Sequence, residues 1–393
     1  MDRQNLSQKR NFYIILSVTL LSVVGVPTII PVFPEMSEQL NVSREKIGLM
    51  ITVFTLPGAL LAPLIGILAD RWGRKKVLIP ALVLFGVSGT LCFFARDFEL
   101  ILGLRFFQGL GAACLGIINT TLIGDVFSGA QKARAMGYNS GALSIATALF
   151  PAIGGLLATI NWYYPFLIPS VALIVALVVY FYLDNPEPVN RPQLQNYFRN
   201  ILRSILTREA IILFLLCFST FMLLFGVIMT YLPIFLKDQF SLNSSKIGFI
   251  LSFLAISTGL VASQLGRISK LLPLKYLIIF GFLTYLIGFF AIPYATNIYG
   301  LLALLLIIGI GQGINVPTIF NILTSIAPID HRGAFMSVNS MTIRAGQTVG
   351  PIIAGILFSL WGISWVFWAG AVLTAFFLLI IVLFVPSFAR LKT

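Results

Sequence analysis

Histidine and cysteine are scarce in this sequence. The 393 residues include one histidine, His331, and three cysteines, Cys92, Cys114 and Cys217, each in an apolar stretch and without CxxC spacing. One histidine cannot supply an HExxH motif, and isolated cysteines in apolar surroundings act as small hydrophobic residues rather than as ligands or disulfides. We therefore expect no metal site.

Two further motifs are absent. No Gly-Lys dipeptide occurs, so the chain lacks the phosphate-binding loop of ATP-hydrolysing proteins, and no Gly-x-Ser-x-Gly elbow is present for a serine nucleophile. We expect no enzyme, no catalytic residue and no bound cofactor.

Charge is also sparse. Only 10% of the residues are charged, against about 25% in soluble proteins, while 58% are hydrophobic and the mean hydropathy is +0.98. A chain of this composition belongs in a lipid bilayer, and at about 20 residues per span it has room for about twelve helices. The net charge of +13 is then a feature of membrane topology, and nucleic acid is not an expected partner.

Apolar runs predict the spans directly. The first run is too long and too interrupted by Pro27 and Pro31 for a cleavable signal peptide. The predicted spans are 12–33, 47–69, 77–95, 98–123, 136–160 and 162–183, then 210–236, 247–266, 276–294, 298–326, 335–360 and 362–385.

The basic residues predict the orientation. Of the 26 Lys and Arg residues, 19 fall on the side of the amino terminus, 5 on the opposite side and 2 inside spans. Because basic loops stay in the cytoplasm, both termini are expected there, in a multi-pass protein of a bacterial plasma (inner) membrane.

One polar segment divides the chain. Residues 184–209 carry Pro186, Pro188 and Pro192, followed by a basic amphipathic run. We predict a six-helix half at 1–183, a cytoplasmic linker at 184–209 and a second six-helix half at 210–393. Two interpretations of the basic run are open: a tether with snorkelling basic side chains, or a segment that lies on the inner membrane surface or binds a regulator.

The two halves repeat at an offset of 200 residues. The offset aligns Lys46-Ile47-Gly48 with Lys246-Ile247-Gly248, Asn139 with Asn339, and Pro151 with Pro351. Duplicated parallel halves place a cavity between them near the bilayer midplane, and rocking exposes it to either side. This organisation is typical of transport by alternating access.

The link after the second span carries the sequence Gly66-Ile-Leu-Ala-Asp70-Arg71-Trp-Gly73-Arg74-Lys-Lys. It resembles the G-x-L-a-D-r-x-G-r-k-x motif of the major facilitator superfamily, and the 6+6 pattern extends the resemblance over the whole chain. The glycines permit a tight turn and close helix approach, and Asp70 suits the positive end of a helix. The resemblance assigns Asp70, Arg74 and Asp125 to a cytoplasmic charge cluster that fastens the outward-facing state.

The fourth span contains Arg105-Phe-Phe-Gln108-Gly-Leu-Gly, which resembles the family's R-x-x-q-G-x-g motif. The resemblance gives Arg105 a buried polar role in substrate or proton handling. Bonding to carbonyls of a neighbouring helix is the equally open alternative, because a charge inside a span needs partners.

The family's antiporter motif, g-x-x-x-G-P-x-x-G-G, has a poor copy around Pro151, where Ala146 and Phe150 replace glycines. A better copy contains Gly346, Gly350 and Pro351. Both close helix packing and a hinge are open for these positions.

Polar residues inside spans are the candidates for substrate binding or coupling. Arg344 stands nine residues into its span, and its counterpart at offset 200 is the uncharged Ser144. Either it lines the cavity or it snorkels to the interface. Uncharged candidates are Gln108, Asn315, Asn339 and Gln347, and Phe221, Phe225 and Met229 form an apolar stripe that suits either amphipathic substrates or plain packing.

No Asp or Glu falls in the middle of any predicted span. Glu35, at the outer end of the first, is the candidate for proton binding, with an ordinary solvated acid as the alternative. The resemblance implies a monomeric, proton-driven drug:proton antiporter of the multidrug efflux type. An exporter of an anionic metabolite such as a siderophore, and a nutrient uniporter or importer, are the alternatives.

Overall fold

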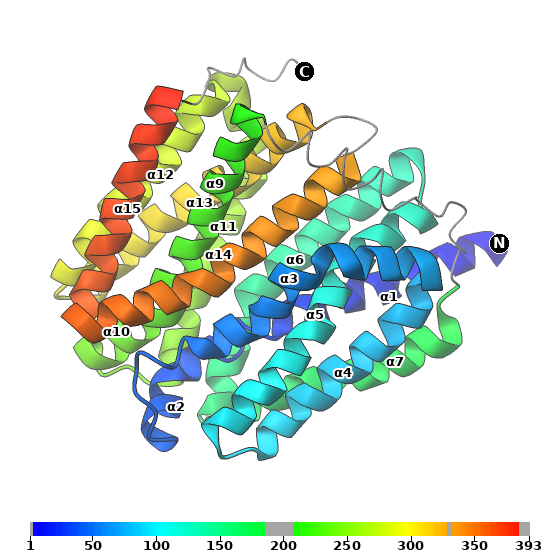
Figure 1. The fold of residues 1–393 in the computed structure, drawn as a ribbon, viewed down its shortest axis with the longest axis horizontal. Coiled ribbons are helices and arrows are strands. Elements are labelled where there is room, and N and C mark those ends of the chain that lie inside the picture. Colours follow the sequence, from blue (N-terminus) through cyan, green and yellow to red (C-terminus); the bar gives the residue numbers. More distant parts are fainter. Residues whose placement is uncertain (1–2, 185–206, 328–331, 385–393) are drawn as a thin grey trace. The chain divides into compact units, whose positions relative to one another are not determined.

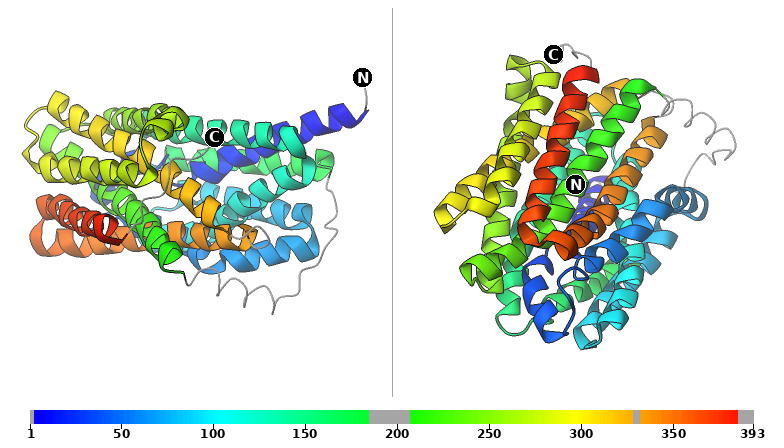
Figure 2. Two further views of the ribbon diagram at one scale, coloured as in Figure 1. Left: turned by 90° about the horizontal axis from the view of Figure 1, so that it is seen from above. Right: turned by 60° about the vertical axis from the view of Figure 1, so that its left-hand side comes forward.

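The computed structural model describes residues 3–184, 207–327 and 332–384, and every regular element in these ranges is helical (Figure 1). Most of the predicted linker, and His331, lie outside them. Two further views show the same construction from long helices packed side by side (Figure 2).

Nine helical elements lie before the linker among the described residues. They are α1 (Arg3–Val24), η1 (Ile30–Val32), α2 (Phe33–Gln39), α3 (Leu49–Trp72), α4 (Arg74–Phe94), α5 (Phe98–Val126), α6 (Gly129–Ala158), η2 (Tyr164–Ser170) and α7 (Val171–Tyr182).

The elements after the linker follow the same plan. They are α9 (Arg208–Leu223), η3 (Leu224–Tyr231, a π-helical stretch), α10 (Leu232–Phe240), α11 (Ser244–Leu271), α12 (Leu274–Ala291), η4 (Ile292–Tyr294), α13 (Ile298–Ile326), α14 (Arg332–Trp361) and α15 (Ile363–Phe384).

Within the described ranges, ten helices are long and apolar enough to cross a membrane. An eleventh candidate is α3, whose parts Leu49–Ala62 and Leu64–Trp72 meet at 62°. The predicted first span, 12–33, does not form one straight helix: α1 ends at Val24 and the apolar run continues through a break into η1. Since α1 begins with polar residues, it contains only part of that apolar run. The predicted all-α architecture in two six-helix halves is confirmed.

The repeat at offset 200 is visible in the helix boundaries. α5 begins at Phe98 and α13 at Ile298, and the residue before each is its N-cap. Asp97 Oδ1 accepts a hydrogen bond from Leu100 N at 2.8 Å, and Asn297 Oδ1 accepts one from Gly300 N at 2.8 Å. Both side chains satisfy an amide that the first helical turn leaves unpaired.

The described residues group into two compact units. Unit 1 comprises Met1–Val42, Leu49–Pro192 and Ser244–Gly248, and unit 2 comprises Ser43–Gly48, Gln193–Asn243 and Phe249–Thr393. In unit 1, α5 packs against α3 and α4; in unit 2, α12 packs against α13 and α15 (Figure 1).

One short segment of each half is grouped with the helices of the other half. Ser43–Gly48 belongs to unit 2, where Arg44 forms an ion pair with Asp238. Ser244–Gly248 belongs to unit 1. These segments contain the two copies of the Lys-Ile-Gly sequence.

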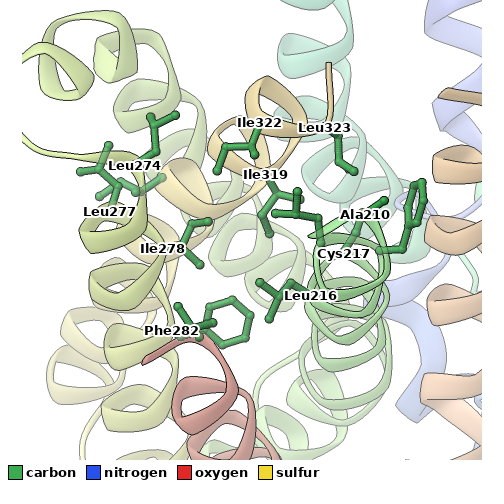
Figure 3. Packing of buried hydrophobic residues seen from close by; sticks show 14 of the residues in the cluster. Ala210, Leu216, Cys217, Leu274, Leu277, Ile278, Phe282, Ile319, Ile322 and Leu323 are labelled. Atoms are coloured by element: carbon green, nitrogen blue, oxygen red, sulfur yellow. The ribbon is translucent and has the colours of Figure 1, made fainter. Parts of the chain in front are cut away.

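The core of unit 2 is assembled from α9, α12 and α13. Figure 3 shows their side chains pointing toward one another, among them Leu216, Ile278, Phe282 and Ile319. Because lipid is as apolar as these side chains, close van der Waals contact rather than escape from water holds such helices together.

α14 packs closely against α9 and η3. A Cβ placed on Gly346 would stand 2.5 Å from the Phe218 carbonyl oxygen, and one on Gly350 would stand 3.0 Å from Gly226 N. These distances favour the packing role over the hinge for the two glycines, because no side chain fits there.

We predict that Gly350→Leu lowers the free energy of unfolding by about 3 kcal/mol, because the new side chain must push α14 away from η3. The matched control is Gly259→Leu in α11, whose Cβ position has no described atom within 4 Å. Melting temperatures of the purified proteins in detergent measure both. Equal losses in the two variants would contradict the packing role.

Candidate functional site

A charge cluster joins three helices at one end of unit 1. Arg74 is the first residue of α4, and its Nη2 donates to Asp70 Oδ1 of α3 at 2.8 Å while its Nε donates to Asp125 Oδ2 of α5 at 2.8 Å. Arg74 Nη1 also donates to the Ala69 carbonyl oxygen at 3.1 Å. One almost fully buried guanidinium thus holds the ends of α3 and α5 together, and all three predicted cluster members meet.

Gly73 makes this cluster possible. Its φ of 94° lies in the left-handed region that favours glycine, and it reverses the chain between the end of α3 and the start of α4. The other predicted members take no part: Arg71 is exposed, and a Cβ on Gly66 would meet no described atom within 4 Å. The expected close approach at Gly66 is therefore not observed.

Arg105 is fully enclosed in the middle of α5. Its Nη1 donates to the Gly25 carbonyl oxygen at 2.6 Å and to Gln108 Oε1 at 2.7 Å, and its Nε reaches the Met50 carbonyl oxygen at 3.4 Å. The guanidinium carbon lies 4.1 Å from the centroid of the Phe54 ring. Of the two alternatives for Arg105, bonding to the carbonyls of neighbouring segments is the one observed.

Unit 1 contains a second polar cluster, which the sequence did not predict. Thr19 of α1, Asn119 of α5 and Asn139 of α6 share hydrogen bonds, with Asn119 Nδ2 donating to Thr19 Oγ1 at 2.8 Å and to Asn139 Oδ1 at 3.0 Å. An asparagine in the middle of a span was the available signal, because such side chains bond across helices in membranes.

Arg344 of α14 is the intramembrane cation of unit 2. Its side chain is partly exposed and, among the described residues, makes one side-chain hydrogen bond, from Nη1 to Gln347 Oε1 at 3.5 Å. No described carboxylate forms an ion pair with it. On the same helix, Asn339 is 1% exposed and neither polar atom of its amide has a partner among the described residues.

Three other candidate residues lie on other helices than Arg344 and Asn339. Asn315 of α13 is fully buried against α12; in the amide orientation that satisfies both of its polar atoms, it donates to the Ile278 carbonyl oxygen at 3.2 Å and accepts from Phe282 N at 3.3 Å. Pro151 lies inside α6, buried beside Gly248. Glu35, in the first turn of α2, is half-buried and forms no ion pair among the described residues.

The apolar stripe on the first helix of unit 2 is partly exposed. Phe221 and Phe225 have ring centroids 6.4 Å apart, and Met229 follows one turn later; all three are half-buried. No group of three potential metal ligands occurs among the residues that were placed.

Comparison with known proteins decides the family. The family model described as Major Facilitator Superfamily matches residues 15–270 and 215–392. The chain belongs to the major facilitator superfamily. It is a secondary transporter, not an enzyme: a multi-pass membrane protein embedded in the bilayer that moves small molecules.

Individual relatives are distant but match over nearly their full length. The chain is 27% identical to the bacillibactin exporter of Bacillus subtilis, over 89% of this chain and 90% of the relative. It is 25% identical to multidrug resistance protein 1 of the same organism, over 92% of each. A bacterial homologue of the human lysosomal transporter Spinster shares the fold, with a TM-score of 0.78, 17% identity and 95% of each chain covered.

The charge cluster of this superfamily member leads to a prediction. Asp70→Asn removes one of the two negative charges that pair with Arg74 without changing side-chain size, so insertion and folding should stay near normal while the transport rate falls at least about tenfold. Transport of a fluorescent substrate, normalised to folded protein, measures the effect.

The control for Asp70→Asn is Asp97→Asn, because asparagine caps a helix as well as aspartate does and Asp97 contacts only its own first turn. A well-folded Asp70→Asn protein with the wild-type rate would show that the cluster has no gating role.

Proposed function

We propose that the protein is a proton-coupled exporter of small amphipathic molecules that works by alternating access. The observation that supports this most directly is the full-length similarity to a siderophore exporter and to a multidrug resistance protein. One of these relatives is an exporter and the other is a multidrug resistance protein, and together they favour efflux over nutrient uptake.

The halves proposed for the motion are 1–183 and 210–393, linked by 184–209. In this proposal the protein is a monomer in a bacterial plasma membrane with both termini in the cytoplasm, and it has no nucleic-acid partner. The Asp70–Arg74–Asp125 cluster belongs to unit 1 and supports a gating role, because ionic contacts at a helix end can differ between two states of a carrier.

Glu35 is the residue proposed to bind the coupled proton. It is half-buried, whereas Asp70, Asp125, Asp184 and Asp238 are each engaged with an arginine. A carboxylate that is not held by a cation can gain and lose a proton without breaking an ion pair.

The test is transport into liposomes that contain the purified protein, with and without an imposed pH gradient. The probes are a permanent aromatic cation, ethidium, and a permanent aromatic anion, anilinonaphthalene sulfonate, because neither follows a pH gradient by itself. We expect the gradient to drive at least one of them, and a protonophore to abolish the flux.

Glu35→Gln should reduce the gradient-driven flux at least about tenfold, while the control Glu38→Gln, on the exposed side of the same short helix, should not. Flux that is identical with and without the gradient would identify a facilitator instead. Wild-type coupling in Glu35→Gln would remove Glu35 from the proposal.

A further inference from the structure

The two arginines inside spans have opposite surroundings. Arg105 is enclosed: it donates hydrogen bonds to two backbone carbonyl oxygens and one amide oxygen and lies over an aromatic ring, all within unit 1. Arg344 donates to one amide oxygen among the described residues, at 3.5 Å. A cation inside a span is costly unless oxygen atoms surround it. Three oxygen atoms accept from Arg105, although its Nη2 has no partner among the described residues, whereas one accepts from the partly exposed Arg344.

Arg344 is too deep to be explained by snorkelling. It stands nine residues after Phe335, where the apolar span begins, which corresponds to about 14 Å along the helix axis. Its one hydrogen bond goes to Gln347, one turn farther from that end of the helix. The guanidinium is therefore held inside the span.

Arg344 also lies on a polar face of α14. At 100° per residue it is about 160° from Gly346 and about 120° from Gly350, the two positions that touch α9 and η3. The same face carries Ser337, Ser340, Gln347 and Thr348. Gln347 and Thr348 are buried within the protein, whereas Arg344 is partly exposed. A partly exposed charge inside a span is not stable against lipid tails, so Arg344 needs water or a ligand beside it.

The guanidinium of Arg344 indicates the chemistry of a ligand. Arginine presents two parallel N–H groups, and a carboxylate accepts hydrogen bonds from both. The aromatic rings of Phe221 and Phe225 do not contribute to this face, since α9 and η3 pack on α14 at Gly346 and Gly350, and Phe221 also packs against the hydrophobic core. The acidic group of an amphipathic molecule therefore complements Arg344 itself.

We propose that Arg344 binds the acidic group of the transported molecule, so that the preferred substrates are amphipathic anions. This inference rests on the proposed export function and adds the substrate's head group to it. The fork geometry makes arginine, rather than any cation, the group required.

The experiment is equilibrium binding to the full-length protein in lipid nanodiscs. Three probes share one ring system and differ in charge: 2-naphthoate, 2-naphthamide and 2-naphthylmethylammonium. We expect wild-type protein to bind the naphthoate at least about tenfold more tightly than the amide, and the ammonium most weakly. A wild-type protein without this preference for the anion would overturn the proposal.

Arg344→Gln should weaken naphthoate binding at least about tenfold and leave naphthamide binding unchanged. The matched control is Arg267→Gln in α11: Arg267 also donates to a glutamine three residues away, Gln264, but it is exposed. Unchanged naphthoate binding in Arg344→Gln, or an equal loss in Arg267→Gln, would contradict the proposal.

If Arg344→Gln does not yield folded protein, binding of the same probes to Arg344→Lys tests the proposal. Lysine keeps the charge but not the fork, so naphthoate binding should weaken at least about threefold with naphthamide binding unchanged; an unchanged naphthoate affinity would refute the assignment. If the protein shows gradient-driven flux but no preference for the anion, proton-coupled export stands and the role of Arg344 is contradicted. If it binds the anion but shows no gradient-driven flux, the role of Arg344 stands and proton-coupled export is contradicted.

Discussion

The interior of a bilayer supplies no hydrogen-bond partners, and this constraint governs the whole molecule. It requires helices, because only a helix pairs its backbone groups within one segment. It also requires every polar side chain inside a span to find protein oxygen atoms, water or a ligand. Arg105 shows the first solution: the carbonyls of Gly25 and Met50 surround its charge, and Phe54 covers its face.

The two units solve the same constraint differently although their sequences repeat at an offset of 200 residues. The position of Arg105 is occupied by the fully buried Leu305 in unit 2, and the position of Arg344 by Ser144 in unit 1. Each unit therefore has one intramembrane arginine at its own depth. Unit 1 uses its arginine to connect segments, whereas the arginine of unit 2 has one side-chain hydrogen bond among the described residues and is partly exposed.

The sequence predicted those features of the fold that recur along the chain. Hydropathy located the spans, and the offset of 200 residues matched the starts of α5 and α13, because both depend on local composition. The first span was misjudged since its apolar run crosses a break after Val24, and hydropathy does not register where a helix ends. The contacts of Arg74 with Asp70 and Asp125 followed from the motif.

Roles that depend on which helix lies opposite could not be predicted. Asn315 was a candidate for substrate binding, but α12 approaches so closely at Gly281 that the amide bonds to its backbone. Asn119 was overlooked because its partners, Thr19 and Asn139, come from helices far away in the sequence. Side-chain type indicates a need for partners, and only the packing shows whether the protein supplies them.

The most direct measurement of this account is the thiol accessibility of the two arginine positions. In a background with the three native cysteines replaced by alanine, Arg344→Cys and Arg105→Cys are treated in membranes with a charged, water-soluble thiol reagent. The account predicts that position 344 is labelled, since it borders water or substrate, and that position 105 is not. Equal labelling of the two positions, or labelling of position 105 alone, would contradict it.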